Sequence, residues 1–112
     1  MAARKNRSRI IRSSGNIFTD LRLPNAEEKL IKARLAVAIN QLLAGHDLSQ
    51  AAAARRLRIN QPKISALANY RLKGFSVERL MNFLTALDCD VEIVIRQKPH
   101  TRKVARILVT AA

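Results

Sequence analysis

Four polar side chains between residues 61 and 69 have the chemistry needed to read the edges of DNA bases. The amides of Gln61 and Asn69 can bond adenine through a donor and an acceptor at once, and the ammonium of Lys63 can reach the acceptors of guanine. The hydroxyl of Ser65 can donate or accept. We therefore predict that Gln61, Lys63, Ser65 and Asn69 contact bases.

A second set of polar side chains surrounds this stretch and suits phosphate better than bases. Arg71 and Lys73 follow the reading segment, and Asn60 stands at its start, where helix N–H groups also attract anions. Contacts of this kind orient a protein on a duplex without carrying sequence information themselves. The predicted phosphate-binding residues are Gln50, Arg55, Asn60, Arg71 and Lys73.

These side chains need two short helices that cross at a fixed angle. Ser49 and Asn60 are suitable N-caps, which predicts helices over residues 50–57 and about 61–69. Ala54 is small enough for a close crossing. The residues expected to face inward and hold the angle are Leu57, Ile59, Ile64 and Leu67.

A longer helix is expected before this pair, over residues 25–44. Asn25 with Glu28 resembles a capping box, and Gly45 supplies a stop. Its apolar stripe at helical spacing comprises Ile31, Leu35, Ala38, Ile39 and Leu42.

Another helix is expected after the pair, over residues 77–87. Ser76 is its N-cap, and Phe75 and Leu80 are placed as a hydrophobic staple across the cap. Its apolar stripe comprises Val77, Leu80, Met81, Leu84 and Leu87.

The apolar pattern then changes to the alternation of a β-strand. Residues 90–96 (DVEIVIR) predict a strand, and residues 106–110 (RILVT) are a candidate for a second. A lone strand is not stable, so the first must pair with the second or with another chain. Both pairings stay open; we favour the pairing between chains, with Val91, Ile93 and Ile95 at the dimer interface.

The chain thus divides into three parts. Residues 1–24 are a basic arm and a docking segment, residues 25–89 a helical domain, and residues 90–112 a strand or hairpin expected to dimerise. The arm could follow DNA or remain a solvated tail. The segment 15–23 could grip a protein partner or pack on its own domain.

The charge of the chain favours a polyanionic partner. Lys and Arg number 21 against 8 Asp and Glu, which gives a net charge of +13 and a pI near 11.5. Nucleic acid fits this imbalance better than an acidic membrane does. The hydrophobic fraction of 48% is sufficient for a folded domain of 112 residues.

Other functional classes find little support in the sequence. Cys89 is the single cysteine, His46 and His100 lack nearby ligand partners, and the glycines form no phosphate loop. We therefore expect no metal, no cofactor and no enzymatic activity. No apolar run has the length of a membrane span, and no secretory signal is visible, so we expect a cytoplasmic protein without a membrane partner.

Residues 50–69 resemble the XRE-type helix-turn-helix family. The match lies in Gln50, in Ala54 at the crossing, in Ile59 in the turn, and in Ile64 with Ser65. More narrowly, the segments SGNIFTDL, QPKISAL and LKGFSVERLMNFLTALDCDVEIVI resemble HigA-like antitoxins and together span residues 14–95. The family usually has glycine where this chain has Arg58.

The resemblance implies a fold and a function. The fold is mainly α: a lambda-repressor-like bundle of about four to five helices with a C-terminal β-strand or hairpin. The function is that of a homodimeric repressor that binds a palindromic duplex operator, controls its own operon and neutralises a small basic toxin. Two alternatives stay open: a protein-inhibitor module with secondary DNA binding, and a phage-type or housekeeping regulator without a toxin.

Overall fold

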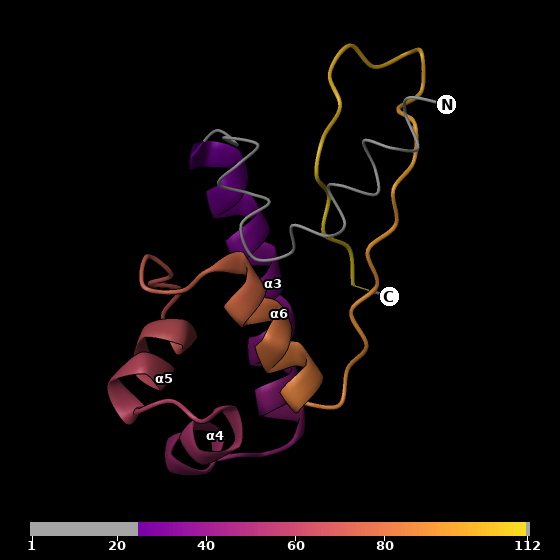
Figure 1. The fold of residues 1–112 in the computed structure, drawn as a ribbon. Coiled ribbons are helices and arrows are strands. Elements are labelled where there is room, and N and C mark those ends of the chain that lie inside the picture. The colour runs from indigo at the N-terminus through magenta and orange to yellow at the C-terminus, as the bar shows by residue number, and fades with distance from the viewer. Residues whose placement is uncertain (1–24, 112) are drawn as a thin grey trace.

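The computed structural model describes residues 25–111 and contains four helices in that range (Figure 1). The helices are α3 (Asn25–Gly45), α4 (Gln50–Leu57), α5 (Gln61–Ala68) and α6 (Val77–Ala86). The predicted bounds of all four are thus confirmed to within about one residue, as helix termini allow. The expectations for the arm and the docking segment of residues 1–24 lie outside the described residues.

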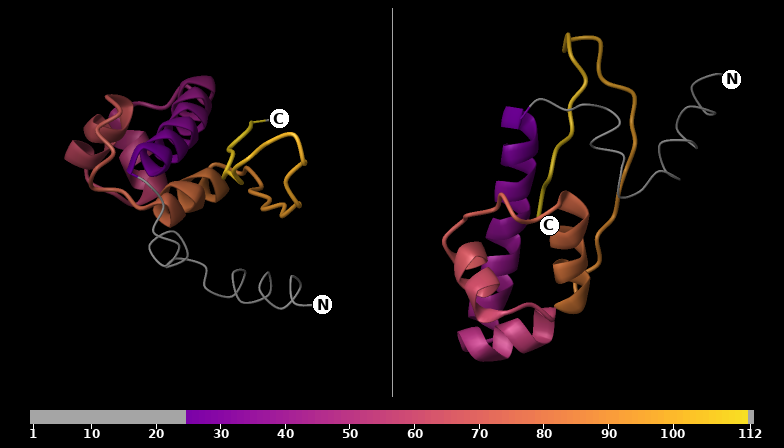
Figure 2. Two further views of the ribbon diagram at one scale, coloured as in Figure 1. Left: turned by 90° about the horizontal axis from the view of Figure 1, so that it is seen from above. Right: turned by 60° about the vertical axis from the view of Figure 1, so that its left-hand side comes forward.

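The long helix α3 packs against α6, and α4 and α5 lie across one end of this pair (Figures 1 and 2). The shared core is apolar because each helix turns one stripe inward. The buried side chains of α3 are Ile31, Leu35, Ala36 and Ile39, and those of α6 are Val77, Leu80, Phe83 and Leu84. Burial of these stripes positions the two short helices.

Three helices begin at side chains that cap their free N–H groups. Ser49 accepts from the N–H of Ala52 at 3.1 Å, and Asn60 accepts from that of Lys63 at 2.9 Å. The hydroxyl of Ser76 accepts from the N–H of the third residue after it at 3.0 Å. A cap of this kind stabilises a helix by about 1 kcal/mol. All three predicted N-caps are confirmed.

The four helices end in the same way, although no glycine is involved. After each one, a residue other than glycine adopts a left-handed backbone with φ between 53° and 63°. These residues are Asp47, Arg58, Tyr70 and Asp88. The N–H of the next residue then reaches back to a carbonyl in the last helical turn, at distances of 2.8 to 3.4 Å. This is the Schellman arrangement, which usually places glycine at the left-handed position.

Arg58 adopts the left-handed backbone that glycine usually takes at this position of the family. Its backbone has φ 58° and ψ 45°, so the turn keeps the left-handed geometry expected of glycine. The N–H of Ile59 donates to the carbonyl of Ala54 at 3.0 Å and closes the turn. A Cβ in this conformation costs about 1 kcal/mol. The arginine side chain is therefore tolerated here at a cost to stability.

An ion pair joins the end of α6 to α4. The guanidinium of Arg56 donates to the carboxylate of Asp88 at 3.0 Å and to the carbonyl of Ala86 at 3.2 Å. The second bond satisfies a free carbonyl at the helix end, where a cation is also favoured. Because the pair is exposed, it orients the chain more than it stabilises it.

The predicted C-terminal strands are wrong for the described residues. Residues 90–111 form an open loop, which we call the C-terminal excursion (Figure 1). Its two limbs are residues 90–96 and 106–110, and neither forms a β-strand. Within the described residues 90–111, the one backbone–backbone hydrogen bond is donated by the N–H of Arg102 to the carbonyl of Pro99, at 3.2 Å. β-branched residues favour an extended chain, but a strand needs a partner ladder, and the two limbs do not supply one to each other.

The excursion is nevertheless attached to the helices. The N–H of Ile107 donates to the carboxylate of Glu27 at 3.0 Å, and Ile107, Val91 and Val109 pack against the core. The rest of the apolar side chains point outward: Ile93 is 73% exposed and Val104 72%. Among the expected interface residues, Val91 thus lies on its own domain, while Ile93 and Ile95 are exposed.

Among residues 25–111, none of the helices is both long and apolar enough to cross a membrane.

Replacing Arg58 by glycine should stabilise the fold. Glycine removes the strained Cβ, so we expect the free energy of unfolding to rise by about 1 kcal/mol and Tm by about 4–8 °C. Arg58→Ala is the matched control, because it removes the same charge but keeps a Cβ. Equal stabilities of the two variants in denaturant titration would show that the left-handed backbone carries no cost.

Candidate nucleic-acid interface

The crossing of α4 and α5 depends on small side chains. Ala53 and Ala54 are buried on α4, and Ile64 and Leu67 are buried on α5. Alanine permits close approach of the two backbones, and the larger residues fill the space between them and α3. The turn residue Ile59 is half-buried against the same core. The predicted roles of these residues in holding the helix pair are consistent with their burial.

A side chain of α3 fixes the far end of α5. The amide nitrogen of Asn40 donates to the carbonyl of Leu67 at 3.1 Å, in a partly buried position. This carbonyl lies in the last turn of α5, where helix carbonyls lack partners within the helix. Asn69 adds a bond from its own amide nitrogen to the carbonyl of Ser65 at 2.8 Å. The orientation of α5 is therefore set by polar contacts as well as by packing.

The outer side of α5 differs from the prediction. Successive helix residues are about 100° apart, so Lys63 lies about 200° around the axis from Gln61. With Ile64 facing the core, Gln61 and Lys63 fall on opposite flanks. The surface between the two flanks consists of Pro62, Ser65, Ala66 and Asn69. The four predicted readers therefore do not share one side: Ser65 and Asn69 lie centrally, and the other two lie at the edges.

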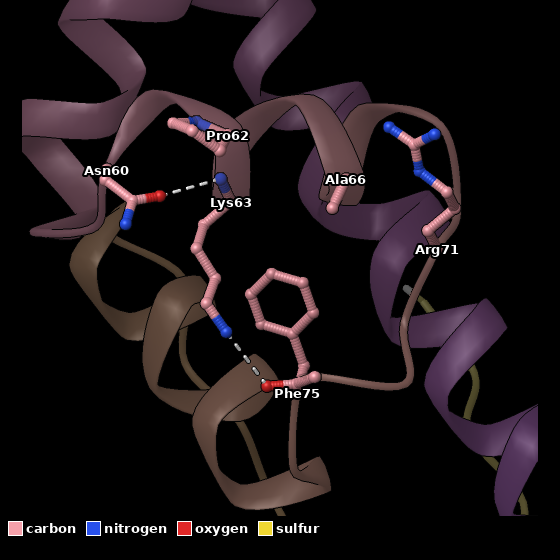
Figure 3. Close-up of a pocket in the computed structure, with 7 residues that line it drawn as sticks. Asn60, Pro62, Lys63, Ala66, Arg71 and Phe75 are labelled. Atoms are coloured by element: carbon pink, nitrogen blue, oxygen red, sulfur yellow. Dashed lines mark hydrogen bonds between the residues drawn. The ribbon is translucent and has the colours of Figure 1, made fainter.

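Lys63 is held by the loop that follows α5. Its ammonium donates to the carbonyl of Gly74 at 3.4 Å and lies 5.1 Å from the centroid of the Phe75 ring (Figure 3). Arg79 approaches the same ring, with its guanidinium carbon 5.8 Å from the centroid. Both distances are in the range of cation–π attraction. The amine of Lys63 is thus occupied within the chain.

A shallow pocket of about 280 Å³ lies beside this contact. Its lining consists of Asn60, Pro62, Lys63, Ala66, Arg71, Gly74 and Phe75 (Figure 3). Apolar groups form part of the wall, and the cations of Lys63 and Arg71 stand at its edge. Such a surface suits a backbone sugar or a thymine methyl next to a phosphate. This pocket was not predicted, because Phe75 was expected only to form a hydrophobic staple at the start of a helix.

The predicted phosphate-binding residues all have solvent access. Gln50 begins α4, Arg55 lies on that helix, and Arg71 and Lys73 follow α5; each is exposed. Asn60 is more restricted, because its side-chain oxygen accepts from the N–H of Lys63. Its amide nitrogen is the group that remains to donate. A cap that also offers an N–H donor can meet an anion without losing its structural role.

Charge is segregated along this part of the chain. Residues 48–77 contain no Asp or Glu. Their basic residues are Arg55, Arg56, Arg58, Lys63, Arg71 and Lys73. The whole helix-turn-helix segment is therefore cationic, and no carboxylate within it repels a phosphate. The sequence already carries this signal, because no acidic residue separates Asp47 from Glu78.

Comparison with known proteins agrees with this geometry. The family of helix-turn-helix domains matches residues 17–96. A solved structure named as an XRE family transcriptional regulator is 65% identical, with a TM-score of 0.77, and the match covers 80% of this chain and all of that chain. No curated protein matches. The chain belongs to the helix-turn-helix domain family, within the XRE-type group of DNA-binding transcription regulators, which are not enzymes.

Proposed function

We propose that the chain is a sequence-specific repressor that inserts α5 into the major groove of duplex DNA. The observation that carries this proposal is the acid-free surface of residues 48–77 around a helix whose outer residues are small or polar. A small outer surface lets the helix approach the base edges closely. Ser65 and Asn69 face the floor of the groove, and Gln61 reaches bases from one flank. Lys63 reaches them from the other flank once its ammonium leaves the contact with Gly74 and Phe75.

The surrounding residues hold the duplex by its phosphates. Gln50, Arg55, Asn60, Arg71 and Lys73 frame α5 on both sides of the turn. Arg58 extends this set: its side chain is exposed at the turn, and a phosphate contact there would explain why a strained arginine replaces glycine. Contacts of this class raise affinity for every sequence alike and make binding sensitive to salt.

Selection of bound duplexes from a random pool should recover one preferred site. Gln61→Ala and Lys63→Ala should each relax the preference at the base pair contacted, by about 1–3 kcal/mol of discrimination. Lys73→Ala should weaken all duplexes alike and reduce the slope of log affinity against log salt by about 1. Unchanged preferences in both α5 variants would reject Gln61 and Lys63 as base readers; an unchanged preference in Asn69→Ala as well would reject α5.

The same proposal includes a homodimer formed through the C-terminal excursion. Its support is a row of exposed apolar side chains, which are Ile93, Val94, Ile95, Val104 and Leu108. The limbs also leave backbone N–H and carbonyl groups free of ladder bonds, so a second copy could complete a sheet with them. Two copies related by a two-fold axis would read a palindromic operator.

Ile93→Lys should weaken the dimer strongly, because a charge would be placed in the apolar contact. Sedimentation should then show monomers at concentrations where the unaltered protein is dimeric. Val37→Lys is the matched control, since Val37 is an exposed apolar residue of α3, outside the excursion. Equal dissociation constants for the two variants would place the interface elsewhere.

The finer proposal is that this repressor is an antitoxin. Its support is the resemblance of residues 14–95 to HigA-like antitoxins, which neutralise a small basic toxin. We therefore expect a small basic protein to be encoded in the adjacent gene. The chain should restore the growth of cells that express that protein, and the two proteins should co-purify. Gln61→Ala should rescue equally well, since neutralisation needs protein contact and not base reading. If the unaltered chain does not restore growth, the protein acts as a regulator without a toxin.

A further inference from the structure

The turn of the C-terminal excursion forms a second cationic surface. Residues 93–112 contain no Asp or Glu. Their basic residues lie within eleven positions, with His100 among them: Arg96, Lys98, Arg102, Lys103 and Arg106. Four of the five are exposed, and only Arg102 is half-buried. We call residues 96–106 the basic turn.

The basic turn has a defined backbone. Arg102 donates its N–H to the carbonyl of Pro99 at 3.2 Å, and its guanidinium donates to the carbonyl of Val104 at 3.4 Å. The limb that follows is tied to α3 by the bond between Ile107 and Glu27. The five cations of the turn thus lie within one short, partly fixed segment. Such crowding is unfavourable unless an anion offsets it.

The position of the basic turn separates it from the DNA reader. The turn lies at the opposite end of the molecule from α4 and α5 in two views (Figures 1 and 2). The longest extent of the structure is 49 Å. The major groove is only about 12 Å wide and about 8.5 Å deep. A duplex that receives α5 therefore lies at the end of the molecule formed by α4 and α5, and the basic turn lies at the other end, away from that duplex.

We propose that the basic turn is a second, sequence-independent binding site for the phosphate backbone of a nucleic acid. One protein would then hold two DNA segments, with α5 on the first and the basic turn on the second. The five Lys and Arg side chains lie on an irregular turn and not on a helix or strand that could enter a groove, so they suit contact with the phosphate backbone. A basic protein partner would be repelled by this surface, which argues against a small basic toxin as its occupant.

The proposal rests on the proposed function for the first duplex and goes beyond it for the second. The test is a two-duplex capture with the full chain. A biotin-labelled duplex carrying the selected site is immobilised, the protein is added, and a fluorescent 20-bp duplex of unrelated sequence is supplied. Binding to the first duplex is measured separately by fluorescence polarisation. If the protein binds neither duplex, the proposed function is rejected. If it binds the immobilised duplex but does not retain the fluorescent one, only this inference is rejected.

The decisive variant is Lys98→Gln with Lys103→Gln. Two lost phosphate contacts should weaken retention of the fluorescent duplex roughly 10- to 60-fold at 0.1 M salt and lower the salt slope by about 2. Affinity for the immobilised site should change by less than about twofold, because these residues lie far from α5.

The matched control is Lys29→Gln with Arg34→Gln, which removes two exposed cations from α3. It should retain the fluorescent duplex as well as the unaltered protein does. Equal losses in both double variants would show a general effect of net charge and overturn the proposal. So would unchanged retention in the Lys98 and Lys103 variant, which would place the second duplex on the second reader of a dimer.

An anionic membrane is the competing occupant, because exposed Ile93 and Val94 lie beside the basic turn and exposed Val104 lies within it. Vesicles containing about 30% phosphatidylserine supply the comparison probe. Binding to these vesicles that depends on Lys98 and Lys103, without retention of the second duplex, would overturn the proposal. Retention of the duplex with no binding to vesicles would support it.

Discussion

The fixed orientation of α5 is the constraint on which the chemistry of this protein depends. Ile64 and Leu67 bury one side of the helix, and Asn40 bonds the carbonyl of Leu67 at its end. At the other end, Asn60 caps the first turn. A helix of eight residues would not be stable alone in water. Its outer residues can therefore act as a fixed pattern only because α3, α4 and the two asparagines hold it.

The positions of the helices follow from local rules that the sequence carries openly. Ser49, Asn60 and Ser76 each begin a helix, because a short polar side chain can satisfy free N–H groups. Apolar residues at helical spacing identify the stripes that become buried. These features act over a few residues, so they can be recognised without knowledge of the fold. The helix-turn-helix architecture follows from them together with the small residue Ala54.

Other features depend on contacts between distant segments and could not be predicted in this way. The role of Lys63 is an example, since Gly74 and Phe75 reach it only after the chain turns back. The C-terminal limbs are another. Their composition indicates an extended backbone, but pairing depends on which segment lies alongside. The carboxylate of Glu27 accepts a hydrogen bond from the N–H of Ile107. Among the described residues, no ladder of backbone hydrogen bonds forms between the two limbs.

The left-handed residues that end the four helices have a consequence for the lifetime of the protein. Each carries a Cβ where glycine would be easier, and Asp47, Tyr70 and Asp88 lie in turns separate from that of Arg58. At about 1 kcal/mol each, Arg58 and Tyr70 take a sizeable share of the stability of a small domain, while aspartate accepts this backbone at a lower cost. Every such increment alters the unfolded fraction about fivefold, and cellular proteases act on that fraction. The amount of regulator in a cell can thus be adjusted at these turns while its core remains unchanged.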